Sequence, residues 1–156
     1  MQSQCKIIDY IFKRVSRMEV TVKWVGERAF LGESGSGHTI VMDGPVDHGG
    51  RNIGIRPMEM ILLGVGGCSS FDVMDILQKG RHDVTDCVAE LTAERVDAVP
   101  SVFSKIHLHF KVTGRNLKDS VVQRAVKLSA EKYCSASIML ANSVEITHDF
   151  EVIELT

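Results

Sequence analysis

The alternation of hydrophobic and polar residues divides the chain into short strands, one long apolar helix, two long strands, a second helix and a last strand. Near the N-terminus, alternating patterns at 19–25 and 28–33 predict a β-hairpin, and a shorter pattern at 38–43 predicts a third strand. The turns fall at Gly26-Glu27 and at Gly35-Ser36-Gly37, where glycine suits a sharp reversal of the chain. We therefore expect a small sheet before the long helix.

The segment from Arg56 to Gly80 predicts the helix around which the rest of the chain is organised. Pro57 suits the first helical position, where an N–H has no partner within the helix, and Gly80 is typical of a C-terminal stop. Residues 58–65 are apolar nearly all round, interrupted only by Glu59. This pattern predicts a helix that protein encloses on more than one side.

Three glycines, at positions 64, 66 and 67, precede Cys68 inside this helix. Each interior glycine costs about 0.5–1 kcal/mol relative to alanine, so some benefit should offset the cost. One interpretation is that another backbone, a second subunit or a substrate approaches the Cys68 sulfur closely. The other interpretation is tight packing of the helix on a sheet, and the sequence does not decide between them.

Two long alternating patterns, at 84–96 and 102–112, predict a strand pair joined by the turn at 97–101. The first places these residues on one face: Thr85, Cys87, Ala89, Leu91 and Ala93. In the second, apolar residues alternate with Lys105, His107, His109 and Lys111. The two histidines could bind a metal from one strand face, but the flanking lysines favour a solvated face.

The last third of the chain predicts a helix over 117–133, a short helical piece SASIML and a final strand over 144–155, with Cys134 at the end of the first helix. Strands, helix, two strands, helix and strand form an α+β pattern, without the regular alternation of a doubly wound fold. We find no internal repeat.

Length and composition favour one compact domain, at 18–156, of an ordinary globular protein. A net charge of −2 argues against nucleic acid as the main partner. Four cysteines at irregular spacing form no disulfide framework, which favours a reducing cytoplasm. Since no run reaches the 18 or so continuous apolar residues of a membrane-spanning helix, we expect no membrane association of that kind.

Residues 1–17 are predicted to be an N-terminal extension. Ile7, Ile8, Ile11 and Val15 have helical spacing, which permits a small amphipathic helix, whereas a secretory signal is not expected. The alternative is that translation begins at Met18 and that the extension is a start-site artefact.

Cys68 and Cys134 are the candidate reactive residues, because each stands among small residues, GGCSS and YCSAS, that suit a confined pocket. A thiolate can attack a peroxide to give a sulfenic acid, which a second cysteine condenses to a disulfide. The alternative is two inert core thiols, since free cysteine is often buried. Cys87 is expected to be a core residue, and Cys5 lies in the extension. No motif supports a cysteine–histidine hydrolase.

These residues resemble the osmotically inducible protein C and organic hydroperoxide resistance (OsmC/Ohr) family. The resemblance rests on the helix that begins at Pro57 and carries Glu59 and Cys68, on the long strand pair, and on the segment Cys134-Ser135-Ala136-Ser137, which is similar to the family's C-P-x-S. It covers the chain from Met18 onward. The segments GESGSGH, PMEMILLGVGGCS and SAEKYCS are most similar to a YhfA-like branch.

The resemblance implies an α+β fold in which antiparallel and mixed sheets wrap around a buried central helix. It also implies an intertwined homodimer with two active sites at its interface. Cys68 would be the peroxidatic thiol and Cys134 the resolving one, with small hydrophobic organic peroxides as substrates and a dithiol or lipoyl group as external reductant. No metal, haem or flavin cofactor is implied.

The chain departs from the family at the activating pair. The peroxidases have a glutamate ten residues before the reactive cysteine, where this sequence has Met58, with the carboxylate one place later at Glu59. The activating arginine is predicted to be Arg28, with Arg51 and Arg56 as alternatives. Without a nearby cation, a Cys68 thiol in apolar surroundings has a raised pKa.

Two functions follow as hypotheses. The first is thiol-dependent reduction of organic hydroperoxides, in defence against oxidative stress, by a cytoplasmic dimer that uses Cys68 and Cys134 with Glu59 and Arg28. The alternative is a non-catalytic dimer that binds a small apolar molecule or senses redox state. Its pocket would be lined by Met58, Met60, Leu62, Phe71 and Met139.

Overall fold

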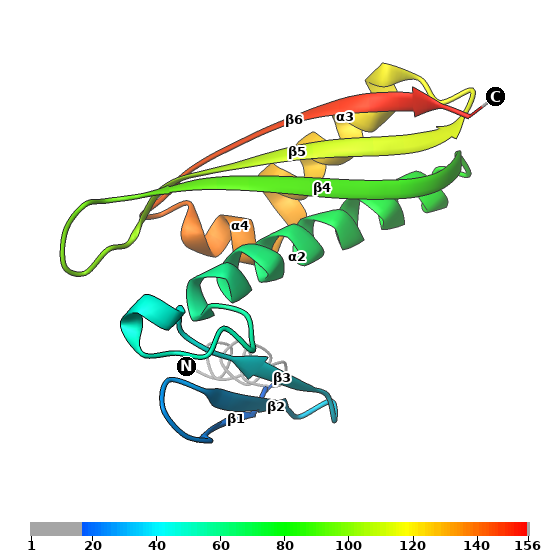
Figure 1. Cartoon of the computed structure of the whole chain (residues 1–156). Coiled ribbons are helices and arrows are strands. Elements are labelled where there is room, and N and C mark those ends of the chain that lie inside the picture. The colour runs from blue at the N-terminus through cyan, green and yellow to red at the C-terminus, as the bar shows by residue number, and fades with distance from the viewer. Residues whose placement is uncertain (1–16, 156) are drawn as a thin grey trace, which may run out of the picture. The chain divides into compact units, whose positions relative to one another are not determined.

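The computed structural model describes residues 17–155, so the helix expected within residues 1–17 lies outside the described residues (Figure 1). The chain forms two compact units, Met1–Pro57 and Met58–Thr156, each of which is described by itself below. The single domain expected at 18–156 stays a prediction.

The first unit contains the three predicted short strands. Strands β1 (Val20–Trp24), β2 (Phe30–Ser34) and β3 (Thr39–Met42) pair antiparallel in sequence order. Gly26 and Gly37 have φ angles of 108° and 85°, a backbone region that glycine enters at no steric cost. The strands and their turns agree with the sequence pattern, apart from small shifts of the strand ends.

After β3, a buried carboxylate organises the loop that leads to the long helix. Asp43 is 1% exposed and accepts backbone N–H groups from Gly44, Arg51 and Ile53 at 2.7, 2.9 and 3.2 Å. Burial opposes ionisation, yet these three donors hold the pKa of Asp43 below its ordinary value. The loop, which includes the short 3-10 helix η1 (Val46–His48), is thereby tied to one anchor.

The second unit is a three-stranded sheet with helices on one face (Figure 1). Its strands are β4 (Asp83–Arg95), β5 (Phe103–Arg115) and β6 (Glu145–Glu154). β4 and β5 pair antiparallel, whereas β5 and β6 pair parallel. Parallel neighbours need a crossover connection, and helices supply it here.

The long helix α2 (Pro57–Lys79) confirms the predicted element and precedes β4. The crossover between β5 and β6 consists of α3 (Asp119–Leu128), a π-helical turn η2 (Ser129–Tyr133) and α4 (Ser135–Leu140). The single helix expected over 117–133 thus widens into a π-helical turn before Cys134. The short helix at SASIML is confirmed.

The core lies between the helices and the apolar face of this sheet. Its fully buried members include Val65, Val73, Leu77, Ile106, Phe110, Val112, Val122 and Val126. The alternating pattern of β5 supplies the sheet side, and α2 and α3 supply the helix side.

Two β-bulges correct the predicted strand faces. The register shifts between Val84 and Asp86, so Val84 packs against the core in place of the predicted Thr85, while Cys87 keeps its predicted place. The register shifts a second time between Glu94 and Arg95, where Arg95 pairs with Phe103. Simple alternation would put Phe103 on the polar face, but its side chain is only 7% exposed. A bulge adds one residue to one strand, and the side chains beyond it change face.

The glycines of α2 separate into two kinds. A Cβ atom at Gly66 would lie 2.8 Å from Cδ1 of Leu91, so this glycine permits tight packing of α2 on β4. Among residues 17–155, a Cβ atom at Gly64 or Gly67 would meet nothing within 4 Å. The packing interpretation is therefore confirmed for Gly66, and it does not explain the other two.

Among the described residues, only one face of α2 is buried, so a single chain does not enclose the helix on more than one side as its apolar pattern predicted. Its buried residues are Val65, Gly66, Ser69, Val73 and Leu77, whereas Ile61, Leu63 and Phe71 are 41%, 61% and 75% exposed. By length and composition alone α2 could cross a membrane, although the sequence has no continuous apolar run of that length. Core helices of soluble proteins also pass this test, so the helix is not evidence of a membrane.

The polar face of β5 lies away from the core, as the lysines beside the two histidines indicated. His107 Nδ1 lies 2.8 Å from Thr147 Oγ1, and His109 Nδ1 pairs with Asp149 Oδ1. The hydrogen bond to Asp149 outweighs partial burial and raises the pKa of His109, and the same bond lowers the pKa of Asp149.

The His109–Asp149 pair should make the free energy of unfolding depend on pH. Because the pKa of His109 is raised in the folded state, its contribution is complete below the unfolded value of about 6.5 and is lost as pH rises through the folded value. Denaturant unfolding midpoints should fall slightly between about pH 6 and pH 8, and His109→Gln should flatten that fall. Asp149→Asn should flatten it less than His109→Gln does, because Glu151 also raises the pKa of His109; an unchanged slope in both variants contradicts the pairing.

Candidate functional site

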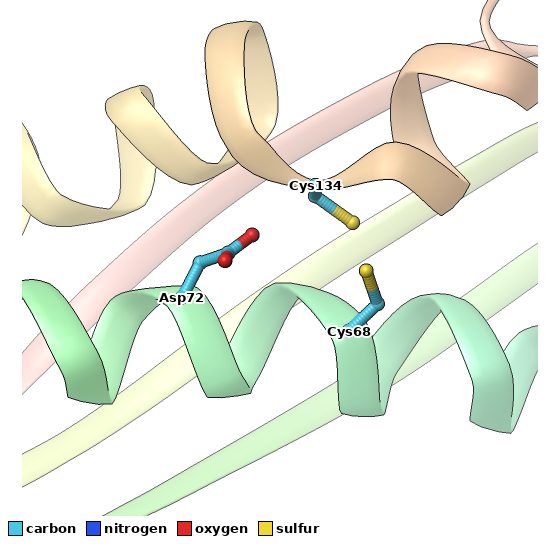
Figure 2. Close-up of side chains that lie close together, drawn as sticks. All are labelled: Cys68, Asp72 and Cys134. Atoms are coloured by element: carbon cyan, nitrogen blue, oxygen red, sulfur yellow. The ribbon is translucent and has the colours of Figure 1, made fainter. Parts of the chain in front are cut away.

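The candidate site begins on the middle of α2, where Cys68 and Asp72 stand four residues apart. Residues at this spacing lie on the same side of a helix, about one turn apart. Figure 2 shows both side chains directed from α2 toward Cys134, which lies on the segment between η2 and α4. The two sulfur atoms and a carboxylate oxygen of Asp72 lie within 4.8 Å of one another. The structure thus brings the two predicted cysteines together within the second unit.

Cys134 owes its position to the end of the π-helical turn. Its backbone is extended (φ −69°, ψ 100°), and it forms the N-cap of α4, where its sulfur accepts the Ser137 N–H at 3.4 Å. π-Helical turns occur often at functional sites because the extra residue redirects the side chains that follow. The sulfur here is fully buried, at 0% exposure.

Three buried serines surround the site. Ser69 Oγ and Ser137 Oγ lie 3.1 and 3.2 Å from the Cys134 sulfur and are placed to donate to it. Ser129 Oγ lies 3.1 Å from the Ser69 carbonyl oxygen and 3.4 Å from Asp72 Oδ2, so its one hydroxyl proton can be donated to either acceptor. These contacts connect α2, η2 and α4 across the site.

The two thiols have opposite electrostatic tendencies. Burial disfavours the Cys134 thiolate, but donors from Ser137, Ser69 and Cys68 outweigh it and lower the pKa of Cys134. Burial raises the pKa of Cys68, and the neighbouring Cys134 and Asp72 add to the effect, although the Ala136 N–H partly opposes it. In the reduced pair, Cys134 is therefore the thiol that ionises first, and Cys68 is the one that keeps its proton to higher pH.

Exposure also differs between the two sulfurs. Cys68 and Asp72 are half-buried, whereas Cys134 is fully enclosed. A molecule from solvent reaches Cys68 before Cys134. Two sulfurs this close can form a disulfide after a small shift, or together they can bind one thiophilic atom.

Glu59 lies in the first turn of α2 and is exposed. It stands nine residues before Cys68 on one continuous helix, which corresponds to about 180° of rotation and about 14 Å along the axis. The Glu59 side chain is therefore attached to the side of α2 opposite the Cys68 side chain. A role for Glu59 in activating Cys68 stays a prediction. It requires a second group that connects the Glu59 carboxylate to the Cys68 thiol.

The candidate arginines belong to the first unit. Arg28 Nε donates to the His48 carbonyl at 3.3 Å, and Arg51 Nε pairs with Glu27 at 3.0 Å. Arg56 donates to the carbonyls of Asp43 and Gly54. Which arginine activates Cys68, with Arg28 the first choice, stays a prediction.

The five residues expected to line an apolar pocket differ in burial, and Met60 is half-buried. Met58 and Leu62 pack against the core of the second unit, whereas Phe71 and Met139 are 75% and 68% exposed. Cys87 also packs against that core, as expected. The site chemistry therefore rests on the cluster of Cys68, Asp72 and Cys134.

Comparison with known proteins identifies the family. Residues 48–149 match the family model described as OsmC-like protein. The protein YhfA of Escherichia coli K12 is 55% identical over 139 residues, which cover 87% of this chain and 98% of that relative. This chain belongs to the OsmC-like family. The resemblance expected from the sequence is confirmed, including the similarity to YhfA.

Solved OsmC-like structures share the fold. A hypothetical protein from Aquifex aeolicus is 30% identical, with a TM-score of 0.80 over 91% of this chain and 100% of that one. The organic hydroperoxide resistance protein OhrB of Bacillus subtilis is 18% identical, with a TM-score of 0.61 over 87% of this chain and 98% of that one. The second likeness shows the fold alone. The predicted OsmC-like α+β fold is confirmed.

Asp72 and the three serines were not among the site residues predicted from the sequence. The spacing of Cys68 and Asp72 was a usable signal, because residues four apart share a helix face. Ser129 and Ser137 are hydroxyl residues within the small-residue segment around Cys134, but only the folded crossover places them against α2.

The two thiols of this OsmC-like site should ionise in a defined order. Each thiol can be measured alone in a protein that already carries Cys5→Ser and Cys87→Ser. Adding Cys68→Ser leaves Cys134 as the single cysteine, and adding Cys134→Ser leaves Cys68. Thiolate ultraviolet absorbance should place the pKa of Cys134 below the ordinary thiol value and that of Cys68 above it. Ser69→Ala should raise the pKa of Cys134, because it removes one donor to the thiolate. The reverse order of ionisation would contradict the hydrogen-bond arrangement.

Proposed function

We propose that this protein reduces organic hydroperoxides, with Cys68 as the attacking thiol and Cys134 as the resolving thiol. The observation that carries the proposal is the approach of the two sulfurs to within 4.8 Å, with one of them half-buried. Membership of the OsmC-like family supports it, as does the hydroperoxide-resistance name of the structural neighbour OhrB.

In the first step, the Cys134 thiolate accepts the proton of Cys68 as the Cys68 sulfur attacks one peroxide oxygen. The O–O bond breaks, Cys68 becomes a sulfenic acid, and the departing alkoxide takes the proton and leaves as an alcohol. The two sulfurs lie within 4.8 Å of each other, close enough for Cys68 to pass this proton to Cys134 after a small shift. Such a path compensates in part for the raised pKa of Cys68.

In the second step, the Cys134 thiolate attacks the sulfenic sulfur of Cys68 and forms a disulfide. Hydroxide leaves and is protonated to water. Two electrons from an external dithiol or lipoyl group then return both cysteines to the thiol state, and that reductant becomes a disulfide. A reducing cytoplasm, where such dithiols are maintained, is the compartment that suits this cycle.

The exposed face of α2 supports a homodimer. Leu63, Gly64, Gly67 and Phe71 lie within about 100° of arc on the helix. The glycines leave open space, while Leu63 and Phe71 are largely exposed. Exposed apolar surface of this kind is typical of a protein interface. Cys68 lies about 60° around the helix from Phe71, so a second copy seated on this face would help enclose the site.

Peptide mapping by mass spectrometry tests the peroxide chemistry. One equivalent of an organic hydroperoxide added to reduced protein should produce a Cys68–Cys134 disulfide within minutes, and more slowly with hydrogen peroxide. Cys68→Ser should abolish turnover, whereas Cys134→Ser should react once, more slowly because the base is lost, and retain a trappable sulfenic acid. Cys87→Ser is the matched control and should behave as the parent protein.

Two results would contradict the peroxide proposal. One is normal turnover by Cys68→Ser; the other is no modification of either cysteine by the hydroperoxide. The second result would favour the non-catalytic binding or redox-sensing alternative.

Phe71→Asp tests the dimer. Removing one Phe from each copy costs at least about 3 kcal/mol of association, since a buried Phe contributes about 1.5–3 kcal/mol. The dimer dissociation constant should therefore rise about 100-fold. Sedimentation analysis measures it, with Val99→Asp, at a fully exposed turn position, as the control. A parent protein that stays monomeric at high concentration would refute the interface.

A further inference from the structure

We propose that Cys68, Asp72 and Cys134 form a binding site for a thiophilic divalent metal ion such as zinc in the reduced protein. Among the described residues, these are the three whose ligand atoms gather within 4.8 Å of one another. The distances in a tetrahedral zinc site, with Zn–S of about 2.3 Å and Zn–O of about 2.0 Å, put ligand atoms about 3.5–3.8 Å apart. Closing to that geometry requires contraction of about 1 Å, within reach of side-chain rotation.

The ligand types select the metal. Two thiolates and one carboxylate suit zinc or cobalt, and they do not suit magnesium or calcium, which prefer all-oxygen surroundings. The three ligands carry a formal charge of −3, which a divalent cation largely neutralises. With three protein ligands, the fourth position is left for water or an external thiol, as in open zinc sites.

The surrounding serines hold the ligands in place. Ser69 and Ser137 donate to the Cys134 sulfur, and Ser129 lies 3.4 Å from Asp72 Oδ2. Such contacts fix the orientation of metal ligands and are a regular part of protein metal sites. The half-buried Cys68 and Asp72 leave a path for the ion, while the enclosed Cys134 forms the floor of the site.

The site would be sensitive to oxidation. When an organic hydroperoxide oxidises the two thiolates, two electrons pass to the O–O bond, which takes up two protons and gives an alcohol and water. The resulting disulfide no longer provides thiolate ligands, and the metal leaves. Metal binding itself does not depend on the peroxide chemistry, but release on oxidation rests on the proposed function.

Cobalt titration of the reduced, chelator-treated full chain tests the site. Binding should give one cobalt per chain, a sulfur-to-cobalt charge-transfer band in the near ultraviolet and tetrahedral ligand-field bands in the visible. Zinc should displace the cobalt, and magnesium should not. Cys68→Ser and Cys134→Ser should each lose at least half of the charge-transfer intensity, because one thiolate ligand is gone, and Asp72→Asn should weaken binding roughly tenfold or more.

Cys5→Ser and Cys87→Ser are the controls and should leave the spectrum unchanged. Cys68 and Asp72 are half-buried, so their variants keep the test informative if Cys134→Ser fails to fold. A full spectrum in Cys68→Ser, or unchanged affinity in Asp72→Asn, would overturn the site. Hydroperoxide added to the cobalt protein should bleach the spectrum as the Cys68–Cys134 disulfide forms.

The two proposals fail in different ways. Cobalt binding without disulfide formation would support the metal site and refute the peroxidase function. Disulfide formation in a protein that binds no cobalt or zinc would refute the metal site alone.

Discussion

The hydrogen bonds to the buried sulfur of Cys134 are the interaction on which the site depends. Ser69 on α2 and Ser137 on α4 both reach this sulfur, although they stand far apart in the sequence. A buried charge costs free energy unless hydrogen-bond donors surround it. The two hydroxyls lower that cost for a Cys134 thiolate enclosed by protein. The same contacts hold the crossover helices against α2, so the distance from Cys134 to Cys68 follows from them.

Helix α2 has two roles that place different demands on its faces. One face packs on the sheet so closely that Gly66 leaves room only for Leu91. The other face carries exposed apolar residues and two glycines with open space above them. Cys68 stands between these faces, which makes it half-buried in the single chain and places it at the edge of any interface formed on α2.

The cluster of two thiols and a carboxylate supports two kinds of chemistry for one physical reason. A thiolate is both a good nucleophile and a good ligand for soft metal ions. Oxidation removes both properties at once, because the electron pairs enter the sulfur–sulfur bond. Asp72 distinguishes the two chemistries, since a nearby negative charge disfavours a second thiolate but stabilises a bound cation.

The order and type of the helices and strands could be predicted from the sequence, because each element depends on a local pattern of residues. Pro57 and the glycine after Lys79 bound α2, alternation marks β5, and the small-residue segments single out Cys68 and Cys134 as candidates. The resemblance to family motifs predicted more of the fold than the periodicity of the sequence did. A bulge is a single inserted residue, however, and alternation does not reveal it, so Thr85 was placed on the wrong face.

Which side chains come together in the site depends on the tertiary fold. The approach of Cys134 to Cys68 depends on the parallel pairing of β5 and β6, which forces the chain through a helical crossover over α2. The π-helical turn then directs Cys134 inward, and its extra residue has no signature in the periodicity. Ser69, Ser129, Ser137 and Asp72 became site residues through this packing, because hydrogen bonds act over a few ångströms in space and are indifferent to separation in sequence.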